Sequence, residues 1–164
     1  MAAYREGMVE SDGQPWPAPW DGYLQRVRKP ARVVFSYWDL FQDLGPEPSR
    51  ERRDVWRRLL EKLAWPAGTV AFWPLCEPSG QAVLAKPALF WRGVAELQAA
   101  TVVLFGKRAG MTLFPDRPFA YRSFSMARQG GPRVVVLPGP GELVARNVQA
   151  MKLVLSTLQT LSLD

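Results

Sequence analysis

The sequence predicts an α/β fold, a three-layer sandwich in which a four-stranded, mostly parallel sheet lies between helices. Four short apolar runs recur along the 164 residues, and helical stretches separate them. The runs are almost continuously apolar rather than alternating, which is typical of parallel strands covered on both faces. A chain of this length also suits one domain. The strands are expected at 32–37, 69–73, 101–105 and 133–137.

Three stretches between these runs have a helical pattern. A helix is expected over 50–64, because Ser49 is a good N-cap and apolar residues recur at helical spacing behind it. A shorter helix is expected within 84–98, with Pro87 in its first turn, and one long amphipathic helix over 141–161. Right-handed crossovers then favour the first and third runs as the central pair of strands. The residues expected to face the sheet are Val55, Trp56, Leu59, Leu60, Leu63, Leu89, Phe90, Val94, Leu97, Val144, Val148, Met151, Val154, Leu155 and Leu158.

Residues 1–30 differ from the rest of the chain. Pro, Trp and Arg interleave over 14–30 without helical or strand periodicity, which predicts an extended N-terminal arm before a single α/β domain over 31–164. Trp16 and Trp20 have two interpretations: they pin the arm to its own domain, or they belong to a tail that docks a partner.

Composition excludes several kinds of chemistry. The chain has no histidine, so Ser-His-Asp and Cys-His nucleophiles, histidine bases and zinc sites with histidine ligands are excluded. Cys76 is the one cysteine and gives neither an internal disulfide nor a metal site, so we expect no cofactor and a reducing, cytoplasmic setting. No apolar run approaches the roughly 18 residues of a membrane span, and the N-terminus does not have the pattern of a secretory signal. A membrane partner is therefore not expected.

The charge balance is basic and consists mainly of arginine. The net charge is +6, and 16 of the 21 basic residues are arginine. Arginine suits bidentate phosphate recognition and stacking on bases. A high-GC genome, which enriches Arg, Ala, Gly and Pro together, is the alternative explanation.

Polar, glycine and aromatic residues follow the predicted strands, where ligands bind in open parallel sheets. Aromatic rings there can stack an unpaired base, cations can contact phosphates, and Pro138–Gly141 opens onto a helix N-terminus that attracts anions. Solvated loops, a tight turn and a core Trp38 are the structural alternatives. The candidate residues for binding nucleic acid or phosphate are Tyr37, Trp38, Lys107, Arg108, Arg122, Gly139, Gly141, Arg146 and Asn147.

The familiar phosphate motifs are absent, since neither G-x-x-x-x-G-K-[ST] nor G-x-G-x-x-G follows a strand. Asp39 and Asp43 lie four residues apart, a spacing that indicates a solvated helix face rather than an acid–base pair.

Three segments resemble the uracil-DNA glycosylase superfamily. ATVVLFGKRAG (100–110) is similar to the family's third strand and its glycine turn, and RVVVLPGPGELVARN (133–147) to its last strand, HPS loop and Arg-Asn pair. GTVAFWPLCEP (68–78) occupies the place of the strand that ends in a base-contacting residue. Over about residues 32–163, the resemblance implies a four-stranded parallel sheet that contacts DNA at its strand ends.

The chain departs from that family at the catalytic positions. The family's histidine falls at Gly139, its proline at Pro140 and its serine at Gly141, and Asp39 is the one candidate to activate water in the first motif. The psi-subunit family of bacterial DNA polymerase III, a non-catalytic branch of this fold, is similar in its N-terminal arm, its degraded last motif and its long final helix.

The resemblance therefore implies a catalytically degenerate protein that binds DNA, single-stranded DNA above all, or a replication or repair partner. Two alternatives stay open. One is an active glycosylase or nucleotide-processing enzyme that uses Asp39. The other is an unrelated α/β module for protein interaction.

Overall fold

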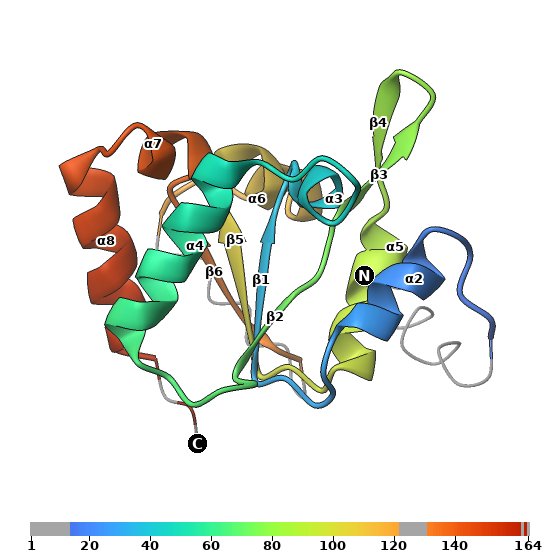
Figure 1. The fold of residues 1–164 in the computed structure, drawn as a ribbon, viewed down its shortest axis with the longest axis horizontal. Coiled ribbons are helices and arrows are strands. Elements are labelled where there is room, and N and C mark those ends of the chain that lie inside the picture. The colour runs from blue at the N-terminus through green and yellow to red at the C-terminus, as the bar shows by residue number, and fades with distance from the viewer. Residues whose placement is uncertain (1–13, 122–130, 162, 164) are drawn as a thin grey trace.

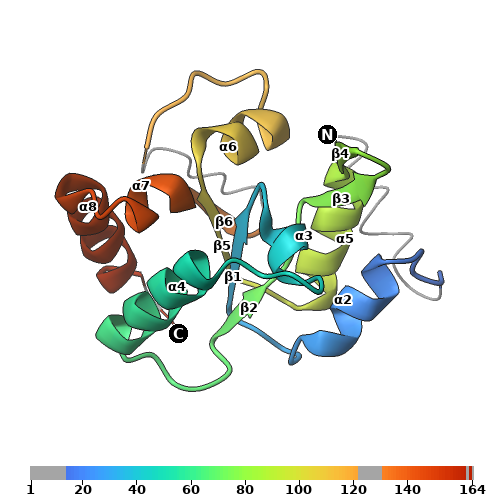
Figure 2. The same cartoon turned by 45° about the horizontal axis from the view of Figure 1, so that its top comes forward.

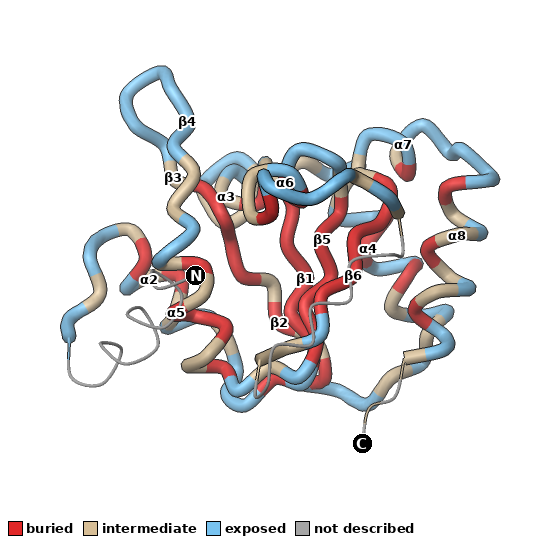
Figure 3. The backbone as a smooth tube through the Cα atoms, turned by 180° about the vertical axis from the view of Figure 1, so that it is seen from behind, coloured by how far each residue is buried: buried red, intermediate tan, exposed pale blue. Residues whose placement is uncertain are grey.

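The computed structural model describes residues 14–121, 131–161 and 163, and its centre is one parallel sheet (Figure 1). The strand order is β2-β1-β5-β6 and every pair is parallel. Strands β1 and β5 are buried along their whole length, as expected for central strands covered on both faces (Figure 3). The predicted fold class and the central pair are confirmed. The strands are β1 (Val33–Tyr37), β2 (Val70–Phe72), β5 (Thr101–Phe105) and β6 (Arg133–Leu137).

Helices form the two outer layers (Figure 2). One face of the sheet packs against α4 (Arg50–Leu63) and α8 (Val148–Gln159), and the other against α2 (Trp20–Arg26) and α5 (Pro87–Glu96). The short helices α3 (Leu40–Asp43), α6 (Lys107–Leu113) and α7 (Pro140–Val144) follow the carboxyl ends of β1, β5 and β6. No helix in the described ranges is long and apolar enough to cross a membrane.

Helix α4 forms where the sequence predicts it. The Ser49 hydroxyl accepts a hydrogen bond from the amide of Arg52 at 3.3 Å, as expected of an N-cap. Val55, Trp56 and Leu59 are buried against the sheet. Leu60 and Leu63, which were also predicted to face the sheet, are only half-buried.

A hairpin over 76–85 precedes the helix expected within 84–98. Helix α5 starts at Pro87 as predicted, but β4 (Ala82–Ala85) pairs with β3 (Cys76–Ser79) in a separate antiparallel ladder that the sequence did not indicate. Its two-residue turn begins at Gly80 with φ +61°, a conformation that glycine adopts without strain.

The single long helix expected over 141–161 is wrong, because the chain breaks after α7. Arg146 takes a left-handed conformation with φ +60°, and the Asn147 side chain accepts a hydrogen bond from the amide of Ala150 at 3.0 Å. An asparagine cap starts a new helix and changes which residues face the sheet. Val148, expected inside, is therefore 64% exposed, while Ala150, Val154 and Leu158 are buried.

The expectation of an extended chain over 14–30 is also wrong in part, because α2 lies within it. Trp20 is fully buried and meets the Trp73 ring at 5.5 Å between centroids. Trp16 meets the same ring at 5.5 Å. The described part of the segment is thus pinned to its own domain by tryptophans, and residues 1–13 of the predicted arm lie outside the described residues.

Candidate functional site

The carboxyl ends of β1, β5 and β6 meet at one edge of the sheet (Figure 2). We call this surface the strand-end edge, formed by Trp38, Gly106, Lys107, Arg108, Gly139 and Gly141. Its central contact joins two elements, because the guanidinium carbon of Arg108 at the start of α6 lies 3.8 Å from the centroid of the Trp38 ring after β1. Trp38 is half-buried and Arg108 is exposed. The pair is a cation–π stack open to solvent.

A second cation beside this stack also lies over an aromatic ring. The Lys107 ammonium is 5.3 Å from the centroid of Phe119, which follows α6. Within the described chain, neither Lys107 nor Arg108 forms an ion pair with a carboxylate. Two uncompensated cations therefore stand side by side on rings at this edge.

Two glycines bring the turns after β5 and β6 together. Gly106 has φ +113°, and its amide donates to the carbonyl of Leu137 at 2.8 Å. A Cβ placed on Gly139 would lie 3.3 Å from the Cα of Gly106, so one of the two turns would have to shift to admit a side chain there. Gly141 lies exposed in the first turn of α7. The starts of α6 and α7 are consequently adjacent.

Three of the predicted binding residues do not join this group, and a fourth lies where the structure gives no description. Tyr37 is buried and points under α4, so it offers no ring for stacking at the edge. Arg146 and Asn147 are exposed at the junction of α7 and α8, where the Asn147 side-chain oxygen is used to cap α8. Arg122 lies outside the described residues.

The two aspartates after β1 have different environments. Asp39 is exposed and makes no capping hydrogen bond at the start of α3. Asp43 was expected on a solvated face, but its side chain is only 8% exposed. Its carboxylate accepts hydrogen bonds from Arg52 Nε at 2.7 Å, Arg52 Nη2 at 2.9 Å and the Ser49 amide at 2.8 Å. The prediction for Asp43 is therefore wrong, because Arg52 on α4 turns back over it.

This network extends to the buried aromatic residues. The Tyr37 hydroxyl donates to Asp43, and the Trp56 indole N–H donates to the Tyr37 oxygen at 3.2 Å. Burial and the hydrogen bond to Asp43 raise the pKa of Tyr37 well above its usual range. Burial alone would raise the pKa of Asp43, but the donors Arg52, Ser49 and Tyr37 outweigh it and the pKa is lowered. Asp43 is thus a structural anion rather than a general base.

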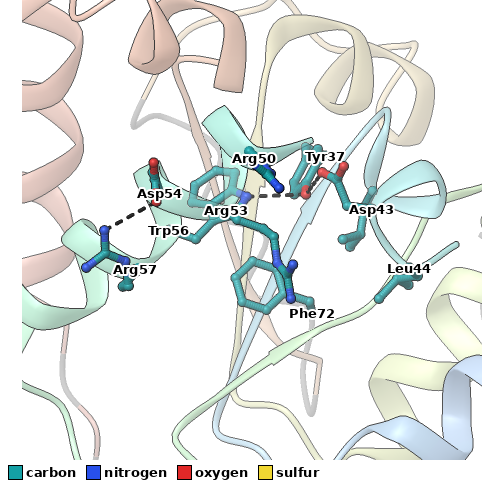
Figure 4. A pocket seen from close by; sticks show the side chains of 10 residues that line it. Tyr37, Asp43, Leu44, Arg50, Arg53, Asp54, Trp56, Arg57 and Phe72 are labelled. Carbon is teal, nitrogen blue, oxygen red and sulfur yellow. Dashed lines mark hydrogen bonds and ion pairs between the residues drawn. The ribbon is translucent and has the colours of Figure 1, made fainter. Parts of the chain in front are cut away.

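Beside the network lies an open groove of about 580 Å³ between α3, α4 and β2, which we call the α4 groove (Figure 4). Its floor is aromatic and apolar, and arginines of α4 form one wall. Sequence reasoning missed this groove, although arginines at 50, 53 and 57 share one face of a helix at that spacing. The lining residues are Tyr37, Leu40, Asp43, Leu44, Arg50, Arg53, Asp54, Trp56, Arg57 and Phe72.

No protein-family model matches this chain, and no curated protein matches it in sequence. Within the described ranges, no three His, Cys, Asp or Glu side chains gather in a way that could hold a metal ion. Burial raises the pKa of the Cys76 thiol to about 12.

Proposed function

We propose that this protein binds single-stranded DNA at the strand-end edge, without excising bases from it. The observation that carries the proposal is the exposed stack of Arg108 on Trp38, with Lys107 beside it. An arginine whose guanidinium lies over an indole still has N–H groups free to donate hydrogen bonds to phosphate oxygens.

The geometry suits an unpaired strand. The half-buried Trp38 can stack a base when the Arg108 side chain moves to the backbone phosphate, and such stacking is worth about 1–3 kcal/mol per base. The adjacent glycine turns at Gly106 and Gly139 carry no side chains, so a sugar–phosphate backbone can approach the main chain closely there.

Two positions, Gly139 and Asp39, support a non-catalytic role. The resemblance to the glycosylase superfamily places its histidine at Gly139, which offers only a backbone N–H to a departing base. Losing one such donor typically costs about 10²–10³ in rate. Asp39, the alternative water-activating group, is exposed, and its side chain makes no capping hydrogen bond to α3 that would orient it.

The test is fluorescence anisotropy with a labelled single-stranded oligonucleotide over a salt series. Each phosphate contact contributes about −0.7 to the slope of log K against log salt, so Arg108→Ala should flatten the slope by about that amount. Arg133→Ala is the matched control, because Arg133 is exposed at the opposite end of the sheet, where β6 begins. Salt-independent binding, or equal slopes for the two variants, would contradict the proposal.

A protein partner is the second candidate, and the β3–β4 hairpin favours it. The hairpin projects from the body of the domain and exposes Val83 and Leu84 at 37% and 44% (Figure 1). Exposed apolar residues on a projecting hairpin are typical of a surface that another protein covers. If the oligonucleotide does not bind, this hairpin becomes the leading site for a DNA-handling partner.

A further inference from the structure

The outer edge of β2 pairs with no strand in the part of the chain that the structure describes, and it lies next to the α4 groove. Strand β2 ends the sheet order, and both views show its free side between α4 and α2 (Figures 1 and 2). Val33 donates to the carbonyl of Thr69 at 3.0 Å, and Trp73 donates to the carbonyl of Phe35 at 3.1 Å. Because backbone groups alternate along a strand, Val70 and Phe72 direct their N–H and C=O groups away from β1.

The floor beside this edge is apolar because its polar atoms are already used. The Trp56 N–H donates to the Tyr37 hydroxyl, which donates to Asp43. Phe72 and Leu44 are half-buried and border the same groove. A side chain that entered the groove would therefore meet rings and aliphatic carbons.

The wall formed by α4 is cationic. Of the two acids that line the groove, Asp43 is held by Arg52 at 2.7 Å and Asp54 by Arg57 at 3.2 Å. Arg50 and Arg53 are exposed and have no ion-pair partner in the described part of the chain (Figure 4). The groove thus presents two uncompensated guanidinium groups above an apolar floor.

We infer that the α4 groove and the edge of β2 dock an acidic, extended segment of a partner protein. The segment pairs its backbone with Val70 and Phe72 as an added strand, places an apolar side chain on the floor, and directs carboxylates to Arg50 and Arg53. Strand addition draws affinity from the main chain and specificity from alternate side chains. A nucleic acid could use the arginines but has no peptide groups to match the edge of β2. The inference is independent of the strand-end edge.

The probe is a fluorescein-labelled ten-residue peptide of alternating valine and glutamate, with a valine–lysine peptide of the same length as its counterpart. Anisotropy should show binding of the acidic peptide only. The double variant Arg50→Glu, Arg53→Glu should weaken it by roughly tenfold or more, since both charge pairs become repulsive. Arg58→Glu is the matched control: Arg58 is exposed on the same helix but does not line the groove, and its change should weaken binding less than about twofold.

Hydrogen exchange supplies a second readout, because attraction to the surface charges alone would not slow amide exchange along β2. The acidic peptide should slow amide exchange in the segment 69–73, where the outward N–H groups of Val70 and Phe72 lie. Equal weakening by Arg58→Glu, or no protection over 69–73, would overturn the inference. Protection of that segment by an oligonucleotide instead, or by self-association of the free protein, would also overturn it in favour of another occupant. Thermal unfolding of each variant checks that the exposed substitutions leave the fold intact.

Discussion

The two faces of the sheet are covered in different ways. On the α5 face, the Trp73 ring lies against the bare backbone of Gly93, and Trp16 and Trp20 close over it. On the α4 face, the aromatic layer of Tyr37 and Trp56 ends in an ionic network with Asp43 and Arg52. On the first face the one buried cation, among the described residues, is Arg92, which lies over the Trp16 ring at 3.9 Å, while on the second face the buried charges form an ion pair.

The polar atoms of the two aromatic layers also have different partners. The Trp73 N–H donates to the Phe90 carbonyl at 3.1 Å, so even the polar atom of that ring is used within the domain. On the other face the network joins Asp43 of α3 to Arg52 of α4, and the α4 groove lies open beside it. The α4 groove therefore lies beside charged side chains, whereas a hollow of about 590 Å³ on the other face lies beside α2 and the residues after α3.

The largest effect is expected from breaking the network. Asp43→Ala leaves Arg52 and the Tyr37 hydroxyl without their buried acceptor, and removing one partner of such a pair typically costs about 3–5 kcal/mol of unfolding free energy. Urea denaturation followed by tryptophan fluorescence measures it. Asp54→Ala is the control, because its pair with Arg57 is exposed and worth under about 1 kcal/mol. Equal losses would show that the α4 face does not depend on its buried charge.

A smaller loss is expected on the α5 face. A Cβ on Gly93 would lie 2.0 Å from the Trp73 ring, so Gly93→Ala forces the indole or the helix to move, and overpacking of this kind typically costs about 1–3 kcal/mol. Gly22→Ala supplies the contrast, because nothing lies within 4 Å of its Cβ and alanine favours a helix by about 0.5–1 kcal/mol. Opposite signs in thermal denaturation would support the tight contact, and a neutral Gly93→Ala would disprove it.

The smallest expected effect is a pH dependence of stability, which the α4 face should show and the α5 face should not. The pKa of Asp43 is lower in the folded protein than its ordinary value of 3.8, so the unfolded chain binds more protons between the two values. Ionised Asp43 therefore stabilises the fold fully above pH 3.8, and this contribution is lost as pH falls through the folded pKa. The difference in urea midpoint between wild type and Asp43→Asn should shrink on acidification. A difference that stayed constant would contradict the role of the charge, and Gly93→Ala should show no such trend.

The sequence was sufficient for the sheet because continuous apolar runs specify parallel strands covered on both faces, and Ser49 marked the start of α4. The sequence pattern did not predict the structure at two places where a single residue determined the local conformation. Asn147 capped a new helix inside an unbroken amphipathic stretch, and burial of Trp20 made a helix in a segment rich in proline.

The candidate site shows the same limit. The strand-end rule brought Trp38, Lys107 and Arg108 together, since parallel strands end at one edge. The rule also selected Tyr37. Because side chains alternate along a strand, Tyr37 packs on the α4 face of the sheet, whereas the next residue, Trp38, packs on the α5 face. The α4 groove depends on Arg52 folding back onto Asp43, a contact between elements that no local pattern contains.

The contact between Gly106 and Gly139 has a consequence for tracing the ancestry of this chain. A side chain is disfavoured at Gly139 because its Cβ would lie 3.3 Å from the Cα of Gly106, and at Gly106 because its φ is +113°. They are separated by 33 positions in the sequence yet touch through their backbones. In distant homologues whose other residues have diverged, we expect a glycine directly after the third parallel strand and another two residues after the fourth to persist.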